Sequence, residues 1–286
     1  MIRVEQATEE LLRNTDVKHA NWLTLAATRT IVNETAGCHV DSDIWRKIKP
    51  LLSRLQLGKC GYCERYLSTA GNELAVDHFR PKRRVDAWPS PIAGATDEGG
   101  ENSHGYFRIA FALHNYVAAC DSCNSRNKRN YFPTAAARRF GTRSADELWG
   151  EQPYLINPAD PREDDPTSLI EWSGIWPQAA HRGGRQRLRA LATIEVLGLA
   201  RDELLVERAR VIREVYNTFH GRAPGRQEDH RLASLDMICR DDSPHATCAR
   251  TFRRACEEEP DRALEHFEEA MELLESVEKS RRRGGP

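Results

Sequence analysis

The chain has 286 residues, of which 40% are apolar and 30% are charged, and its formal net charge is −1. This composition is typical of a soluble globular protein. It excludes a disordered chain and a protein that coats nucleic acid through bulk positive charge. No apolar run is long enough to cross a bilayer, and the first residues lack the apolar core of a secretory signal. We therefore expect a cytoplasmic protein without membrane contact.

The residues before position 58 are expected to be helical. Residues 21–35 form one helix, and residues 41–57 form a second, because apolar residues recur there at helical spacing. Asp41 or Ser42 is the expected cap of the second helix. Pro50 lies inside the apolar stripe of that helix, which predicts a kink or a split into two short helices.

The middle of the chain is rich in cysteine and basic residues. Alternating apolar and polar residues predict a strand over 73–79. Residues 88–105 are rich in Pro, Gly, Ser and Asp and predict a surface loop. We expect a buried helix over 106–115 and the start of another helix over 122–129.

The second half of the chain is expected to be mostly α-helical. Prolines punctuate residues 153–176 and predict an extended, loop-like segment, whereas helical periodicity is clear from residue 185 onward. The last amphipathic helix, 261–278, is strongly acidic, while the segment 59–143 is basic. This helix either packs on its own domain or docks onto a partner subunit.

Two Cys-x-x-Cys pairs, Cys60/Cys63 and Cys120/Cys123, form the strongest chemical pattern in the chain. Two thiolates at this spacing hold one side of a metal tetrahedron, so two pairs predict a four-cysteine zinc site. The alternative is a disulfide or buried thiols, which is less common for such pairs in a reducing compartment. A second candidate set fits no common zinc template and is better explained as buried thiols: Cys239, His245, Cys248 and Cys256.

Asp77 and His78 lie between the two cysteine pairs, at the end of the predicted strand. A neutral imidazole, whose ordinary pKa is about 6.5, can take a proton from water. A carboxylate can hold a divalent ion such as Mg²⁺ through oxygen. Neighbouring strand residues point to opposite faces, so both serve one phosphate only if the strand bends or ends here. Taken alone, the pair is most simply explained as two surface residues.

Two asparagines extend this pattern. Asn124 follows Cys123 directly, and its side-chain oxygen is a suitable second ligand for Mg²⁺. Asn115 can accept a hydrogen bond and orient His78, although a turn or cap is the simpler role for a lone asparagine. Four basic residues are candidate contacts to a phosphate backbone, with a solvated basic face as the alternative: Arg80, Lys82, Arg126 and Lys128.

The string CGYCE…VDHFRPK…HNYVAACDSCNSRNK resembles the HNH (ββα-metal) endonucleases, in the branch where a four-cysteine zinc site clamps the hairpin to the helix. The resemblance implies that Asp77 is a metal ligand and His78 the general base. It also implies that Asn115 orients the base and that Asn124, where many members have histidine, binds the metal. The implied cofactors are a structural Zn²⁺ and a catalytic Mg²⁺ or Mn²⁺.

The flanking strings DHFRPK, GYFRIAFALHNYVAAC, PYLINPADP and LATIEVLGLARDELLVERARVI resemble the HNH subunit of Septu-type anti-phage defence systems, including retron-associated ones. This resemblance runs from about residue 1 to residue 219, and residues 58–133 carry most of it. The insertion at 85–103 is long, and the segment after His220 matches no pattern that we know. The resemblance implies an ATPase partner subunit and a nucleic-acid substrate, with DNA favoured over RNA.

These features predict an α+β, mostly α protein with a ββα-metal motif and three regions. They are an N-terminal helical region (1–57), an HNH nuclease core (58–140) and a mostly helical C-terminal region (141–286) suited to partner docking. The alternative function is a non-catalytic, zinc-dependent nucleic-acid-binding or docking module, in which Asp77, His78 and Asn124 are incidental. Cleavage that EDTA abolishes and Mg²⁺ restores distinguishes the enzyme from this alternative.

Overall fold

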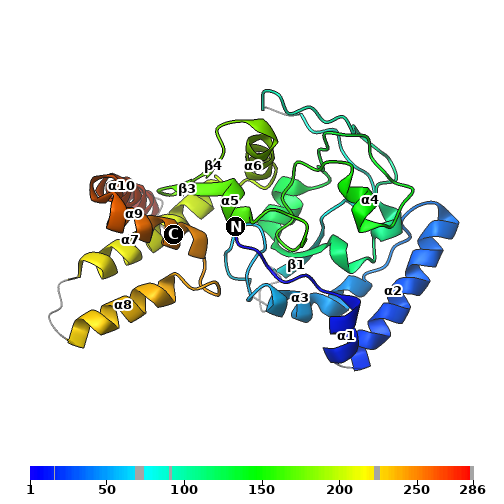
Figure 1. Ribbon diagram of the computed structural model, residues 1–286, viewed down its shortest axis with the longest axis horizontal. Coiled ribbons are helices and arrows are strands. Elements are labelled where there is room, and N and C mark those ends of the chain that lie inside the picture. The colour runs from blue at the N-terminus through cyan, green and yellow to red at the C-terminus, as the bar shows by residue number, and fades with distance from the viewer. Residues whose placement is uncertain (16, 68–73, 90–91, 222–225, 284–286) are drawn as a thin grey trace.

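The computed structural model describes residues 1–15, 17–67, 74–89, 92–221 and 226–283. It is an α+β protein in which helices predominate over two small antiparallel sheets. Figure 1 shows the N-terminal helices at one end of the molecule and the last four helices at the other. Among the helices of the described residues, none is both long and apolar enough to cross a membrane.

The N-terminal part contains α1 (Glu9–Thr15), α2 (Val17–Ala36), the 3₁₀ helix η1 (Ile44–Ile48) and α3 (Lys49–Leu55). The helix predicted over 21–35 is confirmed as part of α2, and the predicted split of the second helix is confirmed as η1 and α3. Pro50 lies in the first turn of α3, where its missing N–H costs no helical hydrogen bond. The predicted cap is wrong. Asp43 occupies that position without a side-chain cap bond, and Asp41 pairs with Arg83.

The central sheet pairs β1 (Leu74–His78) with β2 (Tyr116–Cys120) in antiparallel register, and the π-helical segment η4 (Ser122–Lys128) follows β2. The strand predicted over 73–79 is thus confirmed for residues 74–78, together with the helical start at 122. Residue 73 lies outside the described residues, and Phe79 follows the strand. The predicted buried helix over 106–115 is wrong. That segment forms two 3₁₀ turns, η2 (Phe107–Ile109) and η3 (Leu113–Asn115), because the chain turns extended at Ala112 before it enters β2.

The segment predicted as a surface loop, 88–105, contains no helix or strand among its described residues. It is nevertheless anchored to the protein, since Trp88 and Ala95 are buried in a core with Phe79 and Phe132. The short helix α4 (Ala145–Trp149) begins at Ser144, whose hydroxyl accepts a hydrogen bond from the amide of Glu147.

The second half contains α5 (Pro166–Leu169), β3 (Ile170–Ser173), β4 (Trp176–Ala179), α6 (Gly184–Val196), α7 (Asp202–His220), α8 (Arg226–Ile238), α9 (Ala246–Glu258) and α10 (Pro260–Arg283). The predicted helical character is confirmed, but the hairpin β3–β4 was not predicted. Helices α7 to α10 pack around one core, and the acidic helix α10 contributes Ala263, Ala270 and Leu274 to it. A separate core encloses the four paired cysteines and extends to Leu204 of α7, so α7 belongs to both.

Candidate active site and metal centre

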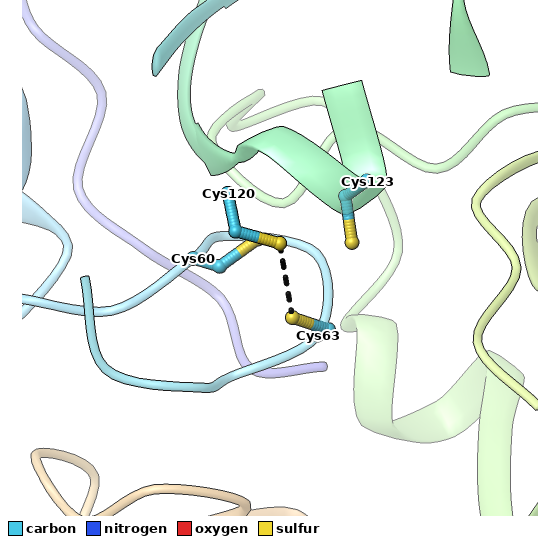
Figure 2. Close-up of side chains that lie close together, drawn as sticks. All are labelled: Cys60, Cys63, Cys120 and Cys123. Atoms are coloured by element: carbon cyan, nitrogen blue, oxygen red, sulfur yellow. Dashed lines mark hydrogen bonds between the residues drawn. The ribbon is translucent and has the colours of Figure 1, made fainter. Parts of the chain in front are cut away.

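The two Cys-x-x-Cys pairs converge on one point, as Figure 2 shows. Cys60 and Cys63 come from the loop after α3, Cys120 ends β2, and Cys123 lies in η4. All four side chains are buried, and their sulfur atoms lie within 4.8 Å of one another. The Sγ atoms of Cys63 and Cys120 are 3.8 Å apart. Zn–S bonds of about 2.3 Å give a tetrahedron with an edge of about 3.8 Å, so the four thiols fit a zinc ion.

A second metal site is not supported by the described part of the chain. The four paired cysteines are the one group of three or more potential ligands found close together there. His245 instead contacts the Glu207 carboxylate at 3.0 Å, and the Cys248 thiol donates to the carbonyl of Gly174. Cys239 and Cys256 are buried in the core of α7 to α10.

The loop that carries the first pair is held tightly against β2. The side-chain amide of Gln56 donates to the Ala118 carbonyl at 2.8 Å and accepts from the Ala118 amide at 2.8 Å, so it pairs with β2 as a strand would. Gly61 donates its amide to the same carbonyl. A Cβ atom at Gly61 would lie 2.8 Å from Val117 Cγ1 and 2.9 Å from Gln56 Nε2, so any other residue at this position must displace these side chains.

Asp77 links the first cysteine loop to β1 and η4. Its Oδ2 accepts a hydrogen bond from the Tyr62 hydroxyl at 2.6 Å, and its Oδ1 accepts one from the Lys128 ammonium at 3.0 Å. Lys128 also donates to the His78 carbonyl oxygen at 3.0 Å. All of these side chains are buried. Burial and the charge of Asp77 raise the pKa of Tyr62 well above its ordinary value, so the phenol remains a donor.

His78 ends β1 and is packed between aromatic rings. Its ring centroid lies 5.0 Å from that of Trp45 and 5.1 Å from that of Tyr116, both edge-on. Nε2 lies 3.0 Å from the Ala110 carbonyl oxygen. Because a carbonyl only accepts, Nε2 carries the proton and Nδ1 keeps its lone pair. Burial, followed by the charge of Lys82, lowers the pKa of His78 well below its ordinary value, so the ring is neutral at pH 7.

The structure does not bring all predicted site residues into contact. The side chains of Asp77 and His78 contact different neighbours, as expected for adjacent residues of a strand. Asn115 is fully buried and accepts from the Arg80 amide at 2.7 Å and donates to the Arg80 carbonyl at 3.0 Å, so it holds the backbone after β1 rather than the His78 ring. Asn124 lies half-buried in η4.

The four basic residues predicted to contact phosphate fall into two groups. Arg80 is buried and pairs with the Glu151 carboxylate at 3.0 Å, and Lys128 is buried on Asp77. Lys82 places its ammonium 3.6 Å from the centre of the Trp45 ring and lines a surface cavity of about 560 Å³. Burial lowers its pKa to about 8. Arg126 is exposed, so Lys82 and Arg126 are the accessible cations of the set.

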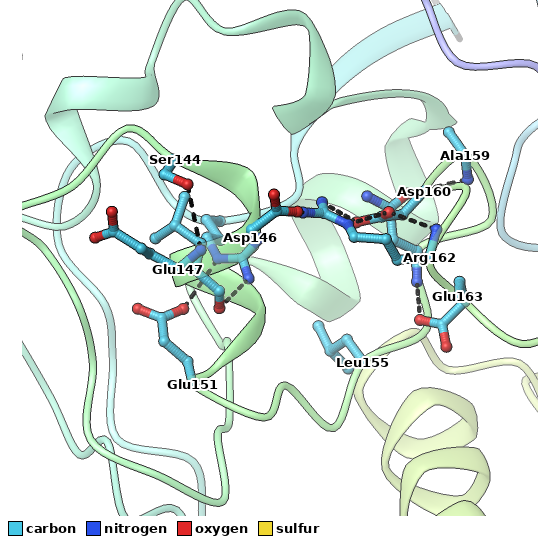
Figure 3. Close-up of polar contacts among 12 residues, drawn as sticks. Ser144, Asp146, Glu147, Glu151, Leu155, Ala159, Asp160, Arg162 and Glu163 are labelled. Carbon is cyan, nitrogen blue, oxygen red and sulfur yellow. Dashed lines mark hydrogen bonds and ion pairs between the residues drawn. The ribbon is translucent and has the colours of Figure 1, made fainter.

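The segment 148–151, which binds the Arg80 guanidinium, was not predicted from sequence. The Arg80 guanidinium also donates to the Leu148 carbonyl, and the second Glu151 oxygen accepts from the Arg139 amide at 2.6 Å. Figure 3 shows Arg162 in the adjoining network, where it contacts Asp146 and Asp160. Since these partners lie up to 71 residues from Arg80, no local pattern pointed to them.

No model of a known protein family matches this chain, and no solved structure matches it. The chain is 30% identical over 217 residues to the Septu protein PtuB of Bacillus mycoides (strain KBAB4). The aligned residues make up 75% of this chain and 68% of that protein. The 217 aligned residues are more than three times the 64 residues from the first to the last paired cysteine. The chain therefore belongs to the family of Septu PtuB proteins.

Proposed function

We propose that this protein is an HNH-type endonuclease that hydrolyses nucleic-acid phosphodiester bonds within a Septu anti-phage defence system, with DNA favoured over RNA. Membership of the PtuB family supports the defence role. It also supports a partner subunit, for which we propose an ATPase. We further propose that residues 1–57, 58–140 and 141–286 act as N-terminal helical region, nuclease core and docking region.

The observation that carries the catalytic proposal is the state of His78. It is a neutral imidazole at the end of β1, directly after the buried carboxylate of Asp77. The elements of this region follow the chain order strand, strand, helix, as β1, β2 and η4. The four cysteines cluster where β2 is followed by η4. This order is the one expected of a ββα-metal site, and it supports that assignment.

His78 acts in the proposed reaction as the general base. Its Nε2–H is held by the Ala110 carbonyl, so Nδ1 is the atom that takes the proton from the attacking water. Asn115 contributes indirectly, because its two bonds to Arg80 fix the chain just after the base. Lys82, at the surface cavity beside Trp45, contacts the phosphate backbone. Arg80 and Lys128 take that role only if they leave their internal carboxylate partners.

Asp77 and Asn124 are the residues that would hold Mg²⁺ or Mn²⁺. Carboxylate and amide oxygens are the ligands that these ions prefer, and Asp77 already attracts the ammonium of Lys128. A bound divalent ion would supply charge stabilisation at the phosphate and the leaving oxygen. A zinc ion held by the four cysteines would have no open coordination position, so it would serve to hold the scaffold.

Substitution of His78 tests the proposal. Loss of a general base typically costs between about 100-fold and 10,000-fold in rate, so we expect His78→Ala to reduce Mg²⁺-dependent cleavage of DNA by at least about 100-fold. His230→Ala, an exposed histidine on α8, is the matched control. Equal zinc content in the two variants shows that the scaffold is intact. Wild-type cleavage by His78→Ala would overturn the proposal.

One observation favours the non-catalytic alternative. Both oxygens of Asp77 have internal partners, and His78 is 7% exposed. A zinc-dependent module that only binds nucleic acid or docks a partner would use these residues for packing. Such a module binds DNA without cutting it, and its binding is unaffected by Mg²⁺. Cleavage that EDTA abolishes and Mg²⁺ restores excludes it.

A further inference from the structure

The loops that carry the cysteines also contact the C-terminal helices. Beside the first cysteine pair, the Lys59 ammonium donates to the Ser243 carbonyl at 2.9 Å. The Glu64 carboxylate accepts from the Thr247 amide at 3.2 Å, and the Glu64 carbonyl accepts from the His245 amide. The three partners lie just before α9 or in its first turn, so this loop contacts the start of α9.

Arg201, the residue just before α7, reaches the cysteine sulfurs directly. One guanidinium nitrogen lies 3.4 Å from Cys123 Sγ, and the other terminal nitrogen lies 3.7 Å from Cys120 Sγ. The guanidinium also donates to the carbonyls of Leu197 and Gly198, at 3.2 and 3.0 Å, which fixes it in place. Arg201 thus connects the end of α6 and the start of α7 to both cysteines of the second pair.

The charge of this arginine suits a metal-thiolate centre. Four thiolates and one Zn²⁺ carry a net charge of −2. N–H donors and a positive charge beside the sulfurs offset that charge and reduce the tendency of a thiolate to take a proton and leave the metal. A neutral cluster of four thiols would offer Arg201 much weaker acceptors.

A second arginine, Arg208 of α7, also indicates a negative charge nearby. Arg208 is fully buried and forms no ion pair within the described residues, and two of its nitrogens have no hydrogen-bond partner. Its guanidinium lies 4.2 Å from the centre of the Trp172 ring and donates to the Leu199 carbonyl at 2.8 Å. A buried cation without a carboxylate is costly. Leu199 lies two residues before Arg201, so Arg208 packs against the segment that carries Arg201. A negative metal centre beside that segment would offset the cost.

We propose that Arg201 is an outer-sphere partner of the metal-bound thiolates of Cys120 and Cys123, and that through it the metal controls the docking of helices α7 to α10. The proposal rests on the proposed zinc centre but not on the proposed cleavage of nucleic acid. Arg201 also pairs with the half-exposed Glu203 carboxylate at 2.6 Å. Metal loss would remove the thiolate charge and leave only that carboxylate to hold Arg201, while the contacts of Lys59 and Glu64 would loosen with the cysteine loop.

The test compares zinc-loaded Arg201→Met and Arg201→Lys with the wild type. Arg253→Met is the control, because Arg253 forms ion pairs with Asp236 and Glu257 at the surface of the C-terminal helices. Zinc content is measured first, and then the rate of zinc transfer to a chromogenic chelator. Loss of an outer-sphere partner typically costs about 10-fold to 100-fold in metal affinity, so we expect Arg201→Met to release zinc at least about 10-fold faster. Arg201→Lys, which keeps the charge but not the fork of donors, should be intermediate.

Limited proteolysis provides the second readout. Removal of zinc from the wild type by a chelator should expose protease-sensitive sites after residue 199. Zinc-loaded Arg201→Met should already be cut at these sites by the protease. Wild-type zinc release by Arg201→Met would overturn the proposal, as would a wild type that contains no metal. If Arg201→Met does not fold, then Arg201→Lys decides, and its agreement with the wild type in both readouts overturns the proposal. Neither readout measures cleavage of nucleic acid, so the outcome is independent of whether the protein is a nuclease.

Discussion

The Lys128 ammonium lies 3.0 Å from the Asp77 carboxylate, and both side chains are almost completely buried. Lys128 donates to the His78 carbonyl as well, so one cation from η4 holds both residues of the Asp-His pair. The pairing explains how an acidic residue is tolerated inside the core beside the cysteine centre. The same ion pair therefore joins Asp77, the proposed metal ligand, to η4.

Removal of Lys128 should therefore destabilise the protein strongly. Breaking a buried ion pair by deleting one partner typically costs about 3–5 kcal/mol, because the other charge stays buried without compensation. We expect the free energy of unfolding of Lys128→Met, measured in urea, to be lower than that of the wild type by that amount. The double variant Lys128→Met with Asp77→Asn should recover part of the loss, since it buries no charge. Equal stabilities of the single and double variants would show that the pair does not act as a unit.

The buried histidine predicts a pH dependence of stability. His78 has an ordinary pKa of 6.5 when unfolded and a pKa well below that value when folded. The unfolded chain therefore binds the proton first, and the contribution of His78 to stability is present above pH 6.5 and is lost as the pH falls toward the folded pKa. The loss amounts to about 1.4 kcal/mol per pH unit for one group.

Urea unfolding at pH 7, 6 and 5 measures this effect. His78→Gln should lose less stability over that range than the wild type, since glutamine does not titrate. His230→Gln changes an exposed histidine and should follow the wild type. The carboxylates are the same in all three proteins and cancel in the comparison. Parallel profiles for wild type and His78→Gln would contradict the assignment of a buried neutral ring.

Close packing at Gly61 gives a prediction about the cysteine loop. Gly61→Ala puts a methyl group against Val117 and Gln56, and overpacking of this kind costs about 1–3 kcal/mol. Because Gly61 lies between Cys60 and Cys63, zinc retention should weaken along with thermal stability. Gly141→Ala is the control, since a Cβ at Gly141 meets nothing within 4 Å. A Gly61→Ala protein with wild-type melting temperature and zinc content would refute the packing argument.

The accessible cations predict the salt dependence of DNA binding. Each phosphate contact removed lowers the slope of log affinity against log salt by about 1. Arg126→Met should show this change with little effect on stability, because its ion pair with Asp121 is exposed. Lys82→Met should show it as well, with some loss of packing on Trp45. Fluorescence anisotropy at several salt concentrations measures the slopes, and unchanged slopes would remove both residues from the interface.

Local patterns in the sequence were sufficient for part of the fold. The helices α2, α6, α7 and α10 follow from apolar spacing, and β1 follows from alternation. The pattern failed at β2, because all five residues of Tyr116–Cys120 are buried and no alternation remains to be read. It also failed over 106–115, where an apolar run that resembles a helix is divided by the extended residue Ala112.

By itself the sequence identified the four cysteines that cluster, since Cys-x-x-Cys spacing is a local property that holds before the chain folds. It also placed Asp77 beside His78 and Asn124 beside Cys123. Only the tertiary structure decided the partners of these residues: Lys128 and Tyr62 on Asp77, Ala110 on His78, and Arg201 on the cysteine sulfurs. Arg201 lies 78 residues from Cys123, and a contact over that distance depends on packing of whole elements, which no short-range periodicity encodes.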